Sequence, residues 1–181
     1  MSSRPSEDRL REVFNIVERY VEEKYQIPVI IKDVPHPFTG DLDGAEIHVD
    51  YEEEVDGAVF ILAHLFGHTV QWNVCDHSRA VGQQGILVNP TSEQMKELGE
   101  YEVTACRYSL QLFHECGIRD LDQWLSNFAA CDYAYLEHVY KTGEKPPFMS
   151  FWREESPLID PLKIPDFEPK RWVSRWEGIV V

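Results

Sequence analysis

The chain has 181 residues, of which 43% are hydrophobic and 12% aromatic, so it is long enough to bury a core as one domain with appendages. Asp and Glu number 32 against 17 Lys and Arg, and the resulting formal charge of -15 repels phosphate backbones and anionic lipid. We therefore expect neither nucleic acid nor membranes as partners.

The beginning of the chain shows no targeting signal. The stretch MSSRPSEDRLREVF is charged where a signal peptide needs an apolar region, and no run of 18 or more apolar residues occurs. We therefore expect a cytoplasmic protein. The cysteines form no C-x-x-C pair and lie in apolar or helical surroundings, which predicts reduced thiols in a core. They are Cys75, Cys106, Cys116 and Cys131.

The first third of the chain predicts one helix and two strands. Apolar residues recur at helical spacing over residues 6–25, behind an acidic first turn. The β-branched run IPVIIKDV (27–34) predicts a buried strand. The segment AEIHVDY (45–51) alternates apolar and polar residues and predicts a second strand, after the turn-like TGDLDG. These two strands predict a small sheet.

Three helices are expected to follow. The first covers about residues 53–72 and leads into a loop that contains Gly and Asn, NVCDHSRAVGQQGILVNP. The second begins at Thr91, which has capping-box spacing to Gln94, and ends at Gly117. The third begins at Asp120, with Gln123 in the same relation, and ends near Gly143. A helix, strands and then three helices predict an α+β fold.

After residue 143 the composition changes. More than half of the 11 prolines lie there, which prevents long helices, while Trp152, Trp172 and Trp176 argue against disorder. We interpret 1–143 as one domain and 144–181 as an irregular arm packed on it. A segment that docks a partner is the alternative interpretation of the arm.

The segment FILAHLFGHTVQW (60–72) carries two histidines four residues apart. At about 100° per residue, Leu65 lies near the middle of the apolar stripe, and His64 and His68 lie together on its flank. The opposite side of the helix is also apolar, which predicts burial all round. Two neighbouring buried imidazoles need partners for their ring nitrogens, and one helical turn places both within reach of a single metal ion.

Glu102 lies at the centre of the apolar stripe of the following helix. A buried carboxylate is costly unless a cation meets it, and the apolar stripes offer no basic partner. Two histidines and one acid on buried faces match a His₂Glu zinc site with a fourth position open to water. We therefore predict that His64, His68 and Glu102 bind Zn. In a metal-free alternative, the same three side chains hydrogen-bond to one another.

Further ligand candidates are weaker. Cys75 is seven residues past His68, and about 10 Å of helical rise would separate the two unless the chain bends after residue 72. A bound Cys75 would close the site and make it structural. His48 and His77 are expected to be ordinary surface residues.

These residues resemble the compact gluzincin metallopeptidases, including minigluzincins and the phage-immunity type that cleaves repressors. LDGAEIHVDY, FILAHLFGH and EYEVTACRY stand in the order of the family's turn and edge strand, histidine helix and glutamate helix. The likeness covers about residues 27–116. It implies a zincin-like fold in which His64, His68 and Glu102 are ligands, Gly67 allows close packing, and residues 45–51 border the substrate cleft.

Leu65 departs from this family, in which a glutamate at that position takes a proton from the water that the metal activates. Losing such a base typically costs ~10²–10⁴ in rate, and no replacement stands out among Glu52, Glu53, Glu54, Glu97 and Glu100. We expect a zinc-binding, catalytically impaired metallopeptidase homologue that acts as a binding or regulatory module, with a peptide or protein as its ligand. An active hydrolase with a base from elsewhere in the fold is the alternative.

Overall fold

The computed structural model describes residues 4–85 and 87–172. The helices in this part are α1 (Glu7–Tyr25), α2 (Val55–Val74), α3 (Asp76–Gln83), α4 (Ser92–Glu115) and α5 (Asp122–Thr142), with a short 3-10 helix η1 (Phe148–Phe151). The strands are β1 (Val29–Lys32), β2 (Gly40–Leu42) and β3 (Ile47–Asp50). The predicted α+β class is confirmed.

Of the four long helices, α1 and α4 begin at a side-chain cap, whereas α2 and α5 do not. Ser6 caps α1 by accepting from the backbone N–H of Arg9, and Thr91 and Gln94 form the predicted capping box of α4. The capping box predicted at Asp120 is wrong, because α5 begins after Leu121, which makes no side-chain cap. Asp120 instead accepts hydrogen bonds from the guanidinium of Arg9 on α1.

The sheet has three strands in the order β1-β3-β2, with β1 parallel and β2 antiparallel to β3. β3 is therefore the central strand, whereas the family resemblance had implied an edge strand at 45–51. Of the two edge strands, β1 and β2, the second falls in the segment that the sequence had predicted as a turn. It is only three residues long and contains Gly40 and Asp41, so it lacks the alternation that predicts a strand.

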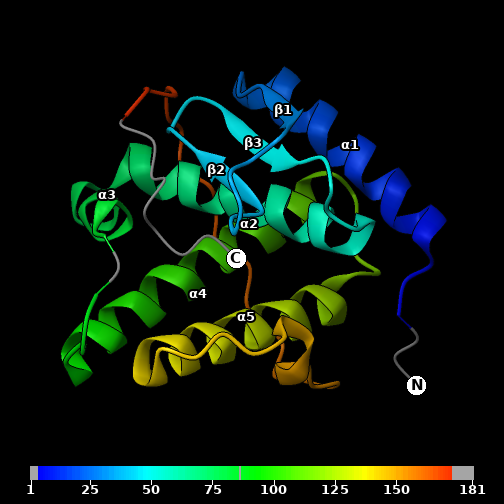
Figure 1. Ribbon diagram of the computed structural model, residues 1–181. Helices are drawn as coiled ribbons and strands as arrows, with labels where there is room; N and C mark the ends of the chain where they lie inside the picture. Colours follow the sequence, from blue (N-terminus) through cyan, green and yellow to red (C-terminus); the bar gives the residue numbers. More distant parts are fainter. Residues whose placement is uncertain (1–3, 86, 173–181) are drawn as a thin grey trace.

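The helix α2 occupies the middle of the molecule (Figure 1). The sheet and α1 lie on one side of it, and α4 lies on the other side, with α5 packed against α4. Every residue from Val59 to Trp72 is buried, as the apolar character of both faces predicts. A polar side chain on this stretch therefore lies in the core and needs a partner there.

The helix α3 falls in the segment predicted as a loop. Its Gly82 lies against a hydrogen-bonded pair of side chains, since a Cβ at this position would approach the Tyr101 hydroxyl and the Trp72 Nε1 to 2.3 and 2.4 Å. Trp72 donates that Nε1–H to the Tyr101 hydroxyl over 2.9 Å. Tertiary contacts of α3 with α2 and α4 thus hold a helix whose eight residues include a glycine.

The segment after α5 forms η1 and is otherwise irregular up to residue 172. It lies against the helices, and its apolar side chains pack on the main core. They include Phe148, Trp152, Ile159, Leu162, Ile164, Phe167 and Trp172. Trp176 lies outside the described residues, so the structure does not test the prediction for 173–181.

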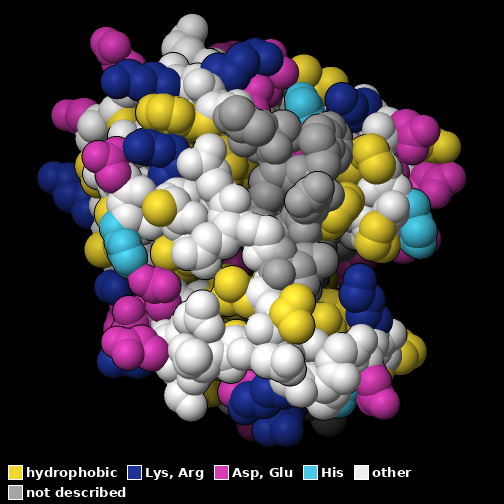
Figure 2. Space-filling view, turned by 60° about the vertical axis from the view of Figure 1, so that its left-hand side comes forward, with side chains coloured by type: hydrophobic (Ala, Val, Ile, Leu, Met, Phe, Trp, Pro, Cys, Tyr) yellow, Lys and Arg dark blue, Asp and Glu magenta, His cyan; other side chains and the backbone are white. Residues whose placement is uncertain are grey.

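Charged side chains of both signs are interspersed on the face drawn in Figure 2, without a large area of one sign. In the part of the chain that the structure describes, no helix combines the length and apolar character that crossing a membrane requires.

Candidate metal centre

Three side chains that are distant in sequence meet between α2 and α4. The Nε2 of His64 lies 2.9 Å and the Nε2 of His68 lies 3.1 Å from the Oε2 of Glu102, and the two ring nitrogens are 3.0 Å apart. The three residues expose only 3%, 5% and 5% of their surfaces. This buried group could hold a metal ion, with one ligand atom from each residue.

Close packing of the two helices brings the group together. A Cβ at Gly67 would lie 2.2 Å from the carbonyl oxygen of Ala105, so the backbone of α4 approaches α2 where a side chain would prevent it. Gly67 precedes His68 directly, and Ala105 lies one turn after Glu102. The glycine thus sets the distance across which the carboxylate reaches the imidazoles.

Gln71 determines which nitrogen of His68 carries a proton. Its Nε2 donates to the carbonyl oxygen of Tyr101 over 3.0 Å, which directs its Oε1 to the Nδ1 of His68 at 2.8 Å. Since an amide oxygen only accepts, His68 donates from Nδ1, and its neutral form carries a lone pair at Nε2. The ring also stacks on Tyr101, with centroids 4.3 Å apart. His68 is thus held as a neutral metal ligand requires.

His64 has a different environment on the same side of α2. Its Nδ1 lies 3.4 Å from the Sγ of Cys106, and its ring stacks on Phe60. Burial raises the pKa of the Cys106 thiol well above its usual value, and the nearby carboxylates of Asp132 and Glu102 add to this rise. Cys106 therefore stays a thiol, as the sequence had indicated, and orients the His64 ring.

Glu102 is ionised because of its two partners. Without a metal ion, burial favours the protonated acid, but a positive charge on His68 and the hydrogen bonds with both histidines outweigh it and lower the pKa of Glu102 below its usual value; a bound metal ion would take the place of that charge. The carboxylate is therefore available as an anionic ligand.

A fourth polar residue, Asp132 on α5, lies beside this group. It is 1% exposed, its Oδ2 is 3.8 Å from the Nε2 of His64, and neither of its oxygens has a hydrogen-bond partner in the described part of the chain. Burial raises the pKa of Asp132; His64 opposes this rise and the charge of Glu102 adds to it. The sequence held the signal, since Asp132 lies four residues from both Phe128 and Leu136 and so shares their apolar face, as Glu102 shares the face of α4.

The other candidates from the sequence lie elsewhere. Cys75 joins α2 to α3 and its sulfur accepts from the backbone N–H of Ser78, while His77 pairs with Glu97 over 2.8 Å. His48 lies on β3 beside Glu46. Leu65 is fully buried and packs against β2, since a Cβ at Gly40 would meet its Cδ1 at 2.7 Å.

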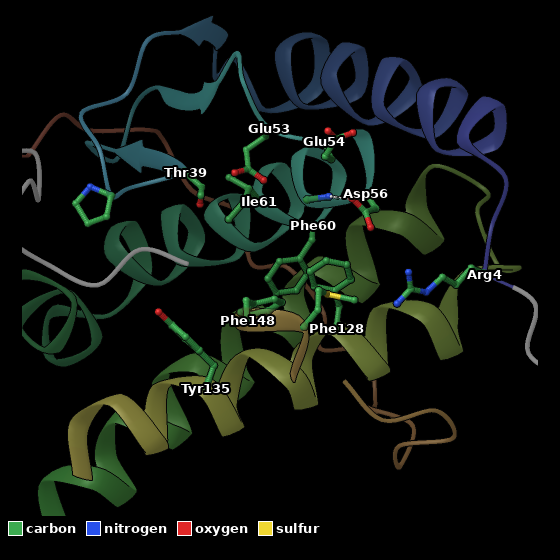
Figure 3. A pocket seen from close by; sticks show the side chains of 13 residues that line it. Arg4, Thr39, Glu53, Glu54, Asp56, Phe60, Ile61, Phe128, Tyr135 and Phe148 are labelled. Atoms are coloured by element: carbon green, nitrogen blue, oxygen red, sulfur yellow. Dashed lines mark hydrogen bonds between the residues drawn. The ribbon is translucent and has the colours of Figure 1, made fainter. Parts of the chain in front are cut away.

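A pocket of about 410 Å³ is lined by Phe60 and Phe128 (Figure 3), and the Phe60 ring also stacks on His64. Phe60 stacks on Phe128, with ring centroids 4.4 Å apart, and both rings line the pocket. Glu53, Glu54 and Asp56, from the start of α2 and the residues before it, add acidic side chains to the lining, which also includes Arg4 and Tyr135. The aromatic pair separates this pocket from His64.

The fold and the group together define an α+β protein with a buried candidate metal centre. Comparison of the chain with protein-family models, with curated proteins and with solved structures finds no match. The resemblance to compact gluzincins thus stands on the residues alone, and what it implies about activity is a proposal.

Proposed function

We propose that this protein binds zinc through His64, His68 and Glu102 and is a zincin-like binding or regulatory module without peptidase activity. The convergence of the three ligand atoms around one point carries this proposal. The resemblance to gluzincins supports the zincin-like class, and Leu65 supports the loss of the general base.

A cation satisfies the group better than hydrogen bonds do. Gln71 leaves a lone pair on the Nε2 of neutral His68, which faces the charged Oε2 of Glu102 at 3.1 Å. A second proton on His68 would relieve this one contact. However, a hydrogen bond joins only two atoms, and three atoms lie within 3.1 Å of one another here: the Nε2 atoms of His64 and His68 and the Oε2 of Glu102. A metal ion can bind all three at once.

The donor set and spacing favour zinc. Imidazole nitrogens with one carboxylate oxygen are typical zinc ligands, and bonds of about 2.0–2.1 Å at tetrahedral angles place ligand atoms roughly 3.3–3.4 Å apart. The observed separations of 2.9–3.1 Å need to open by only a few tenths of an ångström.

Asp132 favours one alternative, an active zinc hydrolase in which this carboxylate replaces the missing glutamate. A base that accepts a proton from the attacking water has to lie near the metal, and the unpartnered oxygens of Asp132 lie beside His64. Turnover of peptides by the natural protein would favour this alternative over a module without activity.

A peptide or protein is our proposed ligand for the module. The pocket beside Phe60 offers it apolar rings and acidic side chains, and Phe60 itself lies one helical turn before His64 and stacks on it. Binding there would contact the stack of Phe60 on His64, which provides a physical link between ligand and metal.

Zinc is expected to stabilise the protein strongly. At a free concentration about 100 times Kd, a ligand that binds only the folded state contributes roughly 2.7 kcal/mol, or about 5–10 °C in Tm for a chain of this size. Thermal unfolding with and without zinc, after EDTA treatment, measures the shift, and elemental analysis of the purified protein should give about one zinc per chain. A protein with neither bound zinc nor a shift in Tm would refute the proposed site.

Replacing Gln71 with methionine is expected to weaken zinc binding about 10–100-fold, since the side chain that fixes the proton on His68 Nδ1 is lost. Competition with a chromophoric chelator measures the affinity. Gln83→Met, at the exposed end of α3, is the control and should bind zinc like the natural protein. Equal affinity of Gln71→Met and the natural protein would show that the amide does not orient His68 for the metal.

A further inference from the structure

We propose that Asp132 is the fourth ligand of this metal ion, so that the centre is a closed His₂-Glu-Asp site that ties α5 to α2 and α4. This inference rests on the proposed zinc binding and adds a residue from a third helix. It makes the metal structural, because four protein ligands leave no position for water or substrate.

The first support is the state of the Asp132 side chain. Its oxygens are buried without a hydrogen-bond partner in the described residues, although buried polar groups are almost always paired. The carboxyl group is directed to the metal group, with its Oδ2 at 3.8 Å from the Nε2 of His64. Burial alone favours the neutral acid in this position, so an ionised carboxylate here requires a cation nearby.

The second support is charge balance. With neutral histidines, Glu102 as the only anionic ligand would leave a divalent cation with one uncompensated positive charge in the core. Ionised Asp132 supplies the second negative charge, so two carboxylates and one divalent ion are neutral together. An uncompensated buried charge is strongly unfavourable, which favours coordination by both acids.

The third support is the burial of the whole group. All four residues are at most 5% exposed, and none of them lines the pocket beside Phe60. A base that acts on water and substrate needs access to both, whereas a structural ligand needs none. Asp132 lies outside the group of atoms within 4.8 Å of one another, so its carboxylate has to move toward the ion on binding. A divalent cation provides the attraction for this movement.

Zinc affinity of Asp132→Asn tests the inference. We expect a loss greater than the roughly 10–100-fold that removal of an outer partner causes. Asp122→Asn, the same change in the first turn of α5, should leave the affinity unchanged. Binding by Asp132→Asn within about threefold of the natural protein would overturn the inference while leaving zinc binding by the other three residues intact. Failure of the natural protein to bind zinc would overturn both.

Cobalt substitution gives a second measurement that needs no variant. In a closed site, the visible bands of the Co²⁺ derivative should not respond to azide, because no coordination position exchanges. In Asp132→Ala the vacated position should bind azide and change the spectrum. A response of the natural protein to azide would mean that the ion keeps an exchangeable position, and would overturn the assignment of Asp132 as a ligand.

Discussion

Replacing Glu102 with glutamine is expected to lower zinc affinity by more than about 100-fold and to remove the zinc-dependent rise in Tm. Glutamine keeps the length and one oxygen of the side chain but loses the negative charge that the ion requires. The loss should exceed the roughly 10–100-fold caused by changes around the ligands, since a ligand itself is altered. Chelator competition and thermal unfolding with and without zinc measure both effects. Glu100→Gln, an exposed neighbour on α4, should behave like the natural protein.

The same variant separates the zinc site from a metal-free hydrogen-bonded group. In EDTA, Glu102→Gln should melt within a few degrees of the natural protein, since the amide can still hydrogen-bond to the ring nitrogens. If an ionised Glu102 held charged His68 without metal, removal of one partner of a buried pair would cost about 3–5 kcal/mol. A large loss of stability in EDTA, with no response of the natural protein to zinc, would establish that alternative.

Replacing Leu65 with glutamate is expected to destabilise the protein by roughly 3–5 kcal/mol without creating peptidase activity. The side chain is fully buried against Gly40 of β2, so a glutamate would place an unpaired carboxylate in the core. Urea unfolding measures the loss. Leu65→Met keeps the volume and apolar character and should cost less than about 1.5 kcal/mol.

Peptide cleavage by the natural protein and by Leu65→Glu completes this test. We expect neither to cleave, because position 65 packs on the sheet and the metal ligands are buried. Cleavage gained by a stable Leu65→Glu would show that the protein lost only its base and that the site admits substrate. Cleavage by the natural protein would instead favour the hydrolase alternative and a catalytic role for a residue such as Asp132.

The sequence predicted most of the elements and singled out the three side chains that meet between α2 and α4. Periodicity located α1, α2, α4 and α5 to within a few residues, because an apolar stripe at helical spacing requires a core to cover it. The same logic singled out Glu102, since a carboxylate in the middle of such a stripe needs a cation. The same reasoning could also have singled out Asp132. Without a second candidate ligand on α5, however, nothing in the sequence linked that acid to the histidines.

Only the tertiary structure decided which buried faces meet. Helical spacing shows that a side chain faces the core, but not which helix lies opposite, so neither the approach of Asp132 to His64 nor the contact of Gln71 with Tyr101 follows from spacing. The strand β2 and the helix α3 were missed for a related reason: β2 is held by its pairing with β3, and α3 by packing on α2 and α4. Their local sequences are too short and too rich in glycine and polar residues to predict them.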